Sequence, residues 1–363
     1  MLNLLACNCE EAAAMKDTFV HLVLGVALAL MVGWILLIGR SIILPVVAGV
    51  VVAYIVLGLA ELFNRLPGLA GRVPAALRYL LAVVVIGSGL VSIVWLIVVN
   101  VGEIAARLPG YQDQMLAAIQ RGAILIGLDH EPSWDTIRRD MLAQINLQRT
   151  LGLTVLSALS TLATLAAIFV YAGFILIERG NFAAKIARLS DNPAQVAQIQ
   201  ELVRDVNNRI GVYLGMKTLI NLGLAVLSYA VLRLWGIEFA GFWAILIGLF
   251  NYIPYLGGFI GVTPTVLVAL LQLDGIGAVS AFLAAMIAAQ VLLGNFIEPW
   301  LMGRSLNLSP FVILVSLVAW ASIWGIPGAI LSVPIMAILV ILFSEFRNTR
   351  TLAILLSKNG ELE

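Results

Sequence analysis

Glu298 is the ionisable residue of this sequence best placed to do chemistry, because it ends a long run without charge and is followed at once by Pro299. A carboxylate in an apolar medium is costly unless it pairs, takes up a proton or faces water. Glu298 is therefore a candidate site for a proton or a monovalent cation. The alternative is a carboxylate at the end of a helix that pairs with Arg304, and the local pattern leaves both interpretations open.

Three amide side chains, Asn251, Gln290 and Asn295, stand in otherwise apolar runs. Each is suited either to hydrogen-bond a polar substrate or to join two helices. The aromatic side chains nearby have two interpretations as well, since they either line a polar path or anchor the chain at a membrane interface. These aromatic residues are Tyr252, Tyr255, Trp300, Trp320 and Trp324.

Pro and Gly interrupt two charge-free stretches, 239–273 and 305–344. Backbone groups freed by such a break cannot face lipid, so each break must be buried in protein or line a polar cavity. Broken helices of this kind mark the substrate region in many transporters, whereas the simpler alternative is a kinked ordinary helix. The candidate residues of a substrate or translocation path are Asn251, Tyr252, Pro254, Tyr255, Gly257, Gly258, Gln290, Asn295, Glu298, Pro299, Arg304, Gly325, Pro327 and Gly328.

The composition requires a membrane around these residues. The chain is 62% hydrophobic and 11% charged, with a mean hydropathy of +1.05, whereas soluble domains are about 45–50% apolar and about 25% charged. A net charge of +1 gives no reason to expect a nucleic-acid partner. Two cysteines and two histidines form no metal or disulfide pattern, and no nucleotide-binding loop or catalytic set is recognisable. We therefore expect no cofactor, no metal, no nucleotide and no enzymatic activity.

The elements that must position the candidate residues are membrane-spanning helices, so the predicted fold is all-α and polytopic with about eight membrane segments. Apolar runs of about 20 residues are long enough to cross a bilayer. The predicted spans are 19–39, 41–60, 79–99, 151–177, 212–234 and 276–297, beside the two broken stretches.

Lys and Arg in short loops predict the orientation, because they favour the cytoplasmic side. They gather after the second span, after the fourth span and in the tail, which places both termini inside. The predicted division is an N-terminal extension that is dispensable (1–18, with Met15 a candidate start), the first three transmembrane helices (19–99), an extracytoplasmic helical region (100–150), the fourth transmembrane helix (151–177), a cytoplasmic amphipathic region (178–211), a C-terminal transmembrane core (212–346) and a cytoplasmic tail (347–363).

Two topologies agree with this orientation. The broken stretches are either single broken spans or re-entrant hairpins that enter and leave on one side. Hairpins place Asp274 outside and Arg304 inside, which the charge rule favours.

Val196, Ile199, Val203, Val206, Ile210 and Tyr213 form an apolar helical stripe. It lies on the membrane surface, on a neighbouring subunit or on loops of its own protomer. Residues 101–127 and 134–147 are also predicted to be helical.

Three sequence blocks, taken together and in this order, resemble the signature of the autoinducer-2 exporter family of bacterial membrane transporters. They are Gly248–Gly258, Asn295–Pro310 and Trp324–Pro334. The resemblance covers the chain from about Phe19 to Phe346. It implies a permease of the bacterial cytoplasmic (inner) membrane that forms a homo-oligomer. Members of that family are associated with export of the quorum-sensing signal autoinducer-2 or with sodium or lithium/proton antiport.

Our leading hypothesis is export of a small polar molecule, with autoinducer-2 as the first candidate, along a path between the two broken stretches. A monovalent cation exchanged for protons at Glu298 is the alternative. A third hypothesis is a membrane scaffold or regulator without transport, which would work through the 196–213 stripe and the outer region.

Overall fold

A computed structural model describes residues 23–65, 73–125, 147–188, 190–302, 307–346 and 349–361. Within these ranges every regular element is a helix, and a single β-bridge joins Leu308 to Ser357. Six helices of the described part are long and apolar enough to cross a membrane. The prediction of an all-α, polytopic membrane protein is confirmed. Residues 1–18, Arg304 and the predicted helix 134–147, apart from its last residue, lie outside the described ranges.

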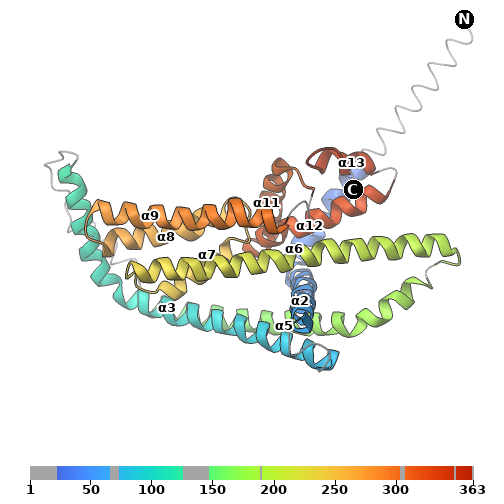
Figure 1. The fold of residues 1–363 in the computed structure, drawn as a ribbon, viewed down its shortest axis with the longest axis horizontal. Helices are drawn as coiled ribbons and strands as arrows, with labels where there is room; N and C mark the ends of the chain where they lie inside the picture. The colour runs from blue at the N-terminus through green and yellow to red at the C-terminus, as the bar shows by residue number, and fades with distance from the viewer. Residues whose placement is uncertain are drawn as a thin grey trace, which may run out of the picture.

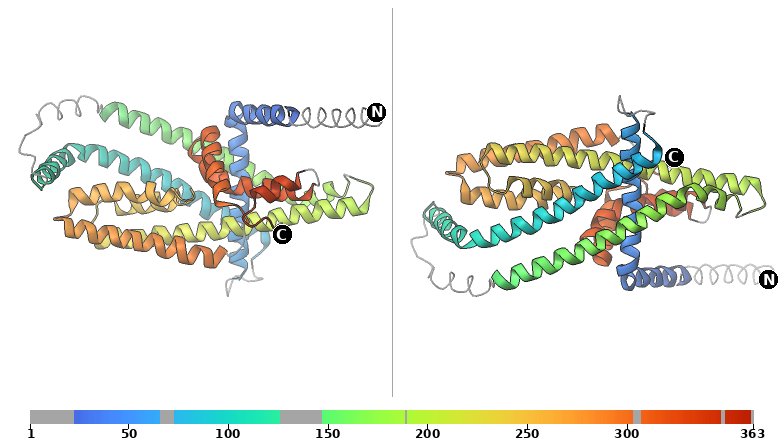
Figure 2. Two further views of the ribbon diagram at one scale, coloured as in Figure 1. Left: turned by 90° about the horizontal axis from the view of Figure 1, so that it is seen from above. Right: turned by 90° about the horizontal axis from the view of Figure 1, so that it is seen from below.

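Several helices extend along the longest dimension of the molecule, and α2 crosses their direction (Figures 1 and 2). The helices are Val23–Ile38, α2 (Arg40–Arg65), α3 (Ala75–Leu125), α5 (Leu147–Ile186), α6 (Pro193–Leu234), α7 (Ala240–Phe250), α8 (Gly257–Gln272), α9 (Ile276–Val291), the π-helical segment η1 (Leu292–Ile297), α10 (Glu298–Met302), α11 (Pro310–Trp324), α12 (Ile326–Glu345) and α13 (Arg350–Leu356).

Two of these helices are longer than the sequence predicted. The third span continues without a break into the outer region as α3, and the amphipathic stripe continues into the fifth span as α6. Asn192 caps the start of α6 by accepting a hydrogen bond from the backbone N–H of Ala194, and Pro193 occupies the first turn, where a missing N–H costs nothing. No proline follows before Leu234, so nothing ends the helix at the membrane surface.

The core has two main parts joined by α6. One part packs α2, α3 and α5 around Val56 and Ala82. The other packs α6, α7, α8 and α9 around Phe282 and Met286, with α7, α8 and α9 lying alongside α6 at one end of the molecule (Figure 1). A third cluster holds α6 against α2 and α12 through Ile210.

The amphipathic stripe packs on its own chain. Val206, Ile210 and Tyr213 belong to the cluster that contacts α2 and α12, whereas Val196 and Ile199 near the start of α6 are only half-buried. Of the three interpretations open at the sequence level, the structure supports packing within the protomer for the later half of the stripe.

Both predicted broken stretches are pairs of helices that pack against each other. α7 and α8 flank the turn 251–256, and α11 and α12 flank Gly325. At 1.5 Å per residue, α7 is only about 16 Å long and α8 about 24 Å, so neither crosses a bilayer core of about 30 Å. A hairpin accommodates two such short helices.

Gly325 forms the corner of the second hairpin with a φ of 67° and a ψ of −144°, a conformation that essentially only glycine adopts. We expect Gly325→Ala to lower the free energy of unfolding by about 2 kcal/mol. Gly277→Ala is the matched control, because a Cβ there meets no atom within 4 Å. Thermal unfolding in micelles measures both, and equal stability of the two variants would contradict this prediction.

The C-terminal segment returns to the start of the second hairpin. The backbone N–H of Ser309 donates to the carbonyl of Leu356 at 3.0 Å, and that of Lys358 donates to the carbonyl of Asn307 at 3.3 Å. Ala353 of α13 is fully buried. The tail is therefore a packed part of the fold that holds the beginning of α11.

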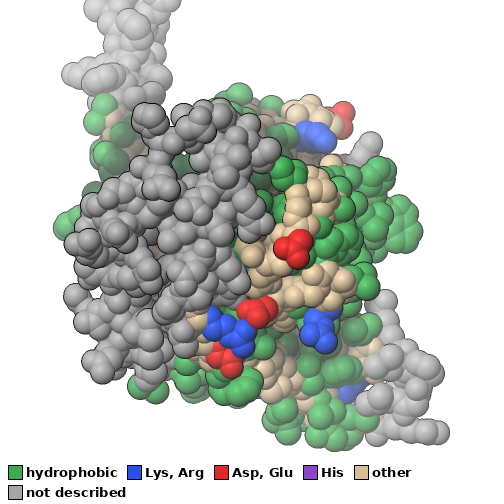
Figure 3. Space-filling model, turned by 90° about the vertical axis from the view of Figure 1, so that its left-hand side faces the viewer, with side chains coloured by type: hydrophobic (Ala, Val, Ile, Leu, Met, Phe, Trp, Pro, Cys, Tyr) green, Lys and Arg blue, Asp and Glu red, His purple; other side chains and the backbone are tan. Residues whose placement is uncertain are grey.

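Much of the described surface is apolar, as expected of a chain surrounded by lipid. Large hydrophobic side chains are exposed on every long helix, including Trp95, Ile177 and Leu234. At the end of the molecule shown in Figure 3, acidic and basic side chains form a small group among hydrophobic ones. Arg107 of α3 pairs with Glu238, in the turn before α7, at 2.7 Å.

Candidate functional site

One turn of α6 carries three polar side chains into the protein interior. Lys217 is 5% exposed and Asn221 4% exposed, and Thr218 lies between them. Residues four apart share one face of a helix, so Lys217 and Asn221 point the same way. Burying the charge of a lysine in a membrane helix costs free energy, so its ammonium group requires a partner within the protein.

The turn of the first hairpin supplies two of the partners. The side-chain amide of Asn251 donates to Oδ1 of Asn221 at 2.7 Å, and the hydroxyl of Tyr252 donates to Oγ1 of Thr218 at 2.8 Å. α7 ends here, and its last backbone groups are satisfied within the turn, where the N–H of Ile253 donates to the carbonyl of Phe250. The start of the break is thus held against α6 by hydrogen bonds, whereas Tyr255 and Leu256 at its end are exposed.

Glu298 supplies the third partner. Its Oε1 accepts a hydrogen bond from Nζ of Lys217 at 2.6 Å, and the glutamate side chain is 24% exposed. We call Lys217, Thr218, Asn221, Asn251, Tyr252 and Glu298 the α6 polar cluster. Its two charges cancel, which lowers the cost of holding them away from water.

A π-helical turn places Glu298 at this position. Leu292–Ile297 forms η1, and the N–H of Glu298 donates to the carbonyl of Leu293, five residues earlier. The extra residue rotates everything after it by about 100° relative to a regular helix, and it makes room for the ring of Pro299. Such single π turns are frequent at functional sites.

An amide beside the cluster keeps a free donor. Within the described residues, the buried Nε2 of Gln290 has no hydrogen-bond partner. Gln290 lies against Gly258, where a Cβ would come within 3.2 Å of its Oε1. Buried donors without a partner cost about 1–3 kcal/mol each, so a polar solute with acceptor oxygens would bind favourably here.

An apolar cluster joins the second hairpin to the first. Ile253 in the first turn packs against Leu317 of α11 and Ala329 of α12. Gly328 is buried, whereas Gly325 and Pro327 at the corner are exposed. Nε1 of Trp324 donates to the carbonyl of Leu36 at 3.0 Å, which ties this corner to the first helix.

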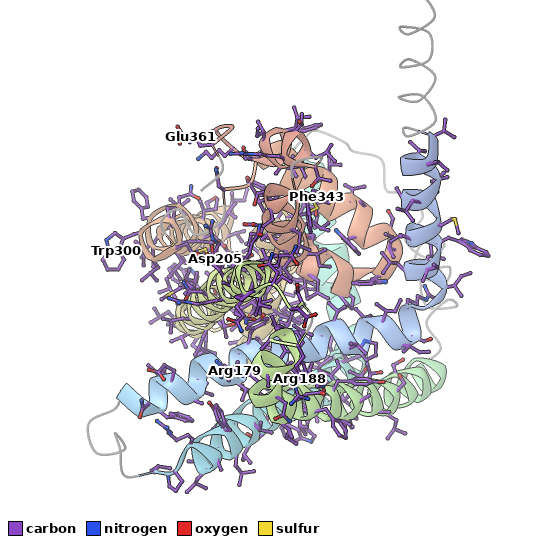
Figure 4. The ribbon with its side chains drawn as sticks, turned by 90° about the vertical axis from the view of Figure 1, so that its right-hand side faces the viewer. Arg179, Arg188, Asp205, Trp300, Phe343 and Glu361 are labelled. Carbon is purple, nitrogen blue, oxygen red and sulfur yellow. The ribbon has the colours of Figure 1, made fainter. Side chains whose placement is uncertain are left out.

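Other predicted path residues lie apart from the cluster. Asn295 and Tyr255 are exposed, and Pro254 is half-buried in the turn. Trp300, 81% exposed, points away from the body of the molecule, which suits an interfacial anchor (Figure 4). Arg304, the alternative partner of Glu298, lies outside the described residues.

Sequence reasoning missed Lys217, Thr218 and Asn221. Lys217 lies near the start of the predicted span 212–234, and the structure shows it buried and paired. The signal that could have found it is the same rule that singled out Glu298, namely that an ionisable residue inside a membrane segment needs a partner of opposite charge. No group of three metal-ligating side chains occurs in the described part of the chain.

Comparison with known proteins finds proteins that are named as transporters or transport proteins. The sequence model of the family described as AI-2E family transporter matches residues 24–348. The chain is 26% identical to the AI-2 transport protein TqsA of Escherichia coli K12, over 92% of this chain and 96% of that protein. It is 27% identical to YhhT of the same organism over 76% of this chain and 78% of YhhT. A candidate transport protein of Borreliella burgdorferi is 32% identical over half of each chain.

Proposed function

Because the chain belongs to the AI-2E transporter family and is a multi-pass membrane protein, we propose that it exports a small polar molecule, with autoinducer-2 as the first substrate to test. TqsA, a relative along almost the whole chain, is named as an AI-2 transport protein. Autoinducer-2 is a small, oxygen-rich furanone, a chemistry that suits free amide donors better than a hydrophobic pocket.

The observation that carries this proposal is the α6 polar cluster at a broken membrane segment. The Asn251 amide lies where α7 ends and donates to Asn221, one helical turn after the Lys217 that pairs with Glu298. The buried donor of Gln290, which lies against Gly258, has no partner among the described residues. An uncharged, hydrogen-bonding solute can exchange bonds with these groups without leaving either charge unpaired. We therefore infer that the substrate passes along the α6 side of the first hairpin.

Flux of autoinducer-2 through purified protein in liposomes tests the proposal. We expect Asn251→Ala to reduce flux about tenfold, since a lost hydrogen bond at a buried site costs about 1–3 kcal/mol. Asn295→Ala is the matched control, because Asn295 is an exposed amide outside the cluster, and we expect it to keep most of the flux. Unchanged flux in folded Asn251→Ala protein would remove the cluster from the path.

Exchange of sodium or lithium for protons is a second candidate function, favoured by one observation, the buried Lys217–Glu298 pair. A monovalent cation could replace the lysine ammonium beside the carboxylate, and a proton could neutralise it. Proton movement that depends on sodium, recorded in the same liposomes and lost in Glu298→Gln, would identify an antiporter. Flux of autoinducer-2 without cation dependence would leave Glu298 as a structural or substrate contact.

The proposal also covers the membrane in which the protein resides, its orientation and its assembly. We propose that it resides in the bacterial cytoplasmic membrane with both termini inside, as the distribution of Lys and Arg favours. The divisions at 99/100, 150/151, 177/178, 211/212 and 346/347 remain part of that proposal, as does assembly into a homo-oligomer. Substrate flux by purified protein would exclude a scaffold without transport.

A further inference from the structure

A cavity of about 840 Å³ opens between α2, α5 and α6, and none of the residues of the α6 polar cluster lines it. Ala53 and Leu57 of α2, with Leu176 and Phe182 of α5, form much of its apolar wall. The wall therefore offers a continuous surface to a hydrocarbon chain.

Two arginines line the same cavity. Arg179 comes from the last part of α5 and Arg204 from the first part of α6. Neither forms an ion pair with any residue that the structure describes. The acidic side chain in the wall, Glu178, is paired with Lys185 outside it. The cavity thus carries an excess of positive charge beside an apolar wall.

The cavity lies where the membrane-facing surface of α5 ends. Phe174 and Ile177 are largely exposed and apolar, and charged residues begin immediately afterwards with Glu178 and Arg179. A boundary between apolar and charged surface on one helix corresponds to the headgroup level of a bilayer.

We propose that this cavity binds an anionic phospholipid, whose phosphate is held by the guanidinium groups of Arg179 and Arg204 and whose acyl chain follows the apolar wall. Arginine binds phosphate through paired N–H donors, and basic pockets between membrane helices bind anionic lipid headgroups. A free phosphate would leave the apolar wall uncovered, a neutral hydrocarbon would leave both arginines unpaired, and a cation would be repelled.

A lipid in this position would act on the helix that carries the functional cluster. Arg204 and Gly211 of the cavity wall belong to α6, and Gly211 lies only ~9 Å along the helix axis from Lys217. A ligand that bridges α5 and α6 stabilises the folded state in proportion to its occupancy. This binding site goes beyond the proposed transport function and does not depend on the substrate.

Thermal unfolding of the purified full chain in a neutral detergent tests the proposal. The probes are dioleoylphosphatidylglycerol, dioleoylphosphatidylcholine with the same acyl chains, and inorganic phosphate. We expect a rise in Tm with phosphatidylglycerol alone, together with a lipid adduct in native mass spectrometry. In the Arg179→Gln/Arg204→Gln variant we expect the apparent affinity for that lipid to fall about tenfold or more. Arg188→Gln, which removes an exposed arginine outside the cavity, should bind as wild type does.

Each other outcome would overturn the proposal. An equal rise with phosphatidylcholine would mean an unspecific apolar site, and a rise with inorganic phosphate alone would mean a site for free anions. Undiminished lipid binding by the double variant would place the lipid elsewhere. A change of subunit number in that variant, with no change in lipid binding, would assign the face to a second copy of the chain. The comparison of the three probes on wild-type protein remains decisive if the double variant does not fold.

Discussion

Glu298→Gln should destabilise the protein by about 3 kcal/mol, because it leaves the Lys217 ammonium buried without a counter-charge. The lysine is almost fully buried, so water cannot replace the lost carboxylate. Lys217→Met combined with Glu298→Gln should recover most of this stability, since removing both charges of a buried pair is often nearly neutral. Chemical unfolding in micelles measures all three proteins.

The matched control is Glu238→Gln. Glu238 also pairs with a basic residue, Arg107, but both side chains are exposed, at 41% and 54%. Exposed ion pairs contribute about 0.5 kcal/mol or less, so this variant should unfold almost as the wild type does. If the Glu298→Gln protein were as stable as the Glu238→Gln protein, the Lys217–Glu298 pair would make no measurable contribution to the free energy of unfolding.

Transport should separate the pair's two roles. The double variant restores packing and charge balance but lacks both the carboxylate and the ammonium, so we expect little flux from it in liposomes. Full flux from a stable double variant would show that the pair serves only to hold α10 on α6.

Gly257→Ala should disrupt the turn of the first hairpin and cause a large loss of stability. A Cβ at Gly257 would lie closer than 3.0 Å to the carbonyl oxygen of Phe250, a backbone atom that cannot move aside as a flexible side chain can. The turn would have to open, which breaks the hydrogen bonds of Asn251 and Tyr252 to α6. We expect a cost of about 3 kcal/mol or more, measured as a lower Tm or as loss of monodisperse protein on gel filtration.

The adjacent glycine is the control. A Cβ at Gly258 would meet only the flexible end of Gln290, at 3.2 Å. Gly258→Ala should therefore shift Tm by only a few degrees. Gly328→Ala should behave like Gly257→Ala, because its Cβ would lie closer than 3.0 Å to the carbonyl oxygen of Trp320 in the second hairpin. Similar stability of the Gly257 and Gly258 variants would mean that the hairpin turn adapts easily.

The positions of the helices and of the breaks were accessible from sequence because lipid imposes a simple rule on the backbone. A membrane segment must satisfy its own hydrogen bonds, so Pro254 and Gly257 in one charge-free run predict a break, and α7 ends at Phe250. The lengths of α3 and α6 were not predicted, because hydropathy detects where a helix leaves lipid and not where the helix ends.

The composition of the polar cluster could not be predicted in the same way. Lys217 and Glu298 are 81 residues apart, and no local pattern connects them. The Tyr252–Thr218 bond is also between distant segments. Likewise, the periodicity of the 196–213 stripe shows which side of the helix is apolar. It does not show which helices pack on that side, because the contacts with α2 and α12 depend on tertiary structure.

The return of the C-terminal segment to residues 307–309 has a consequence for the order of biosynthesis. Ser309 and Asn307 precede α11 and α12, whereas Leu356 and Lys358 are synthesised after both helices. The base of the second hairpin can therefore form these hydrogen bonds only after both of its helices have been synthesised. Closure of the fold at this point is therefore a late event in the synthesis of the described chain.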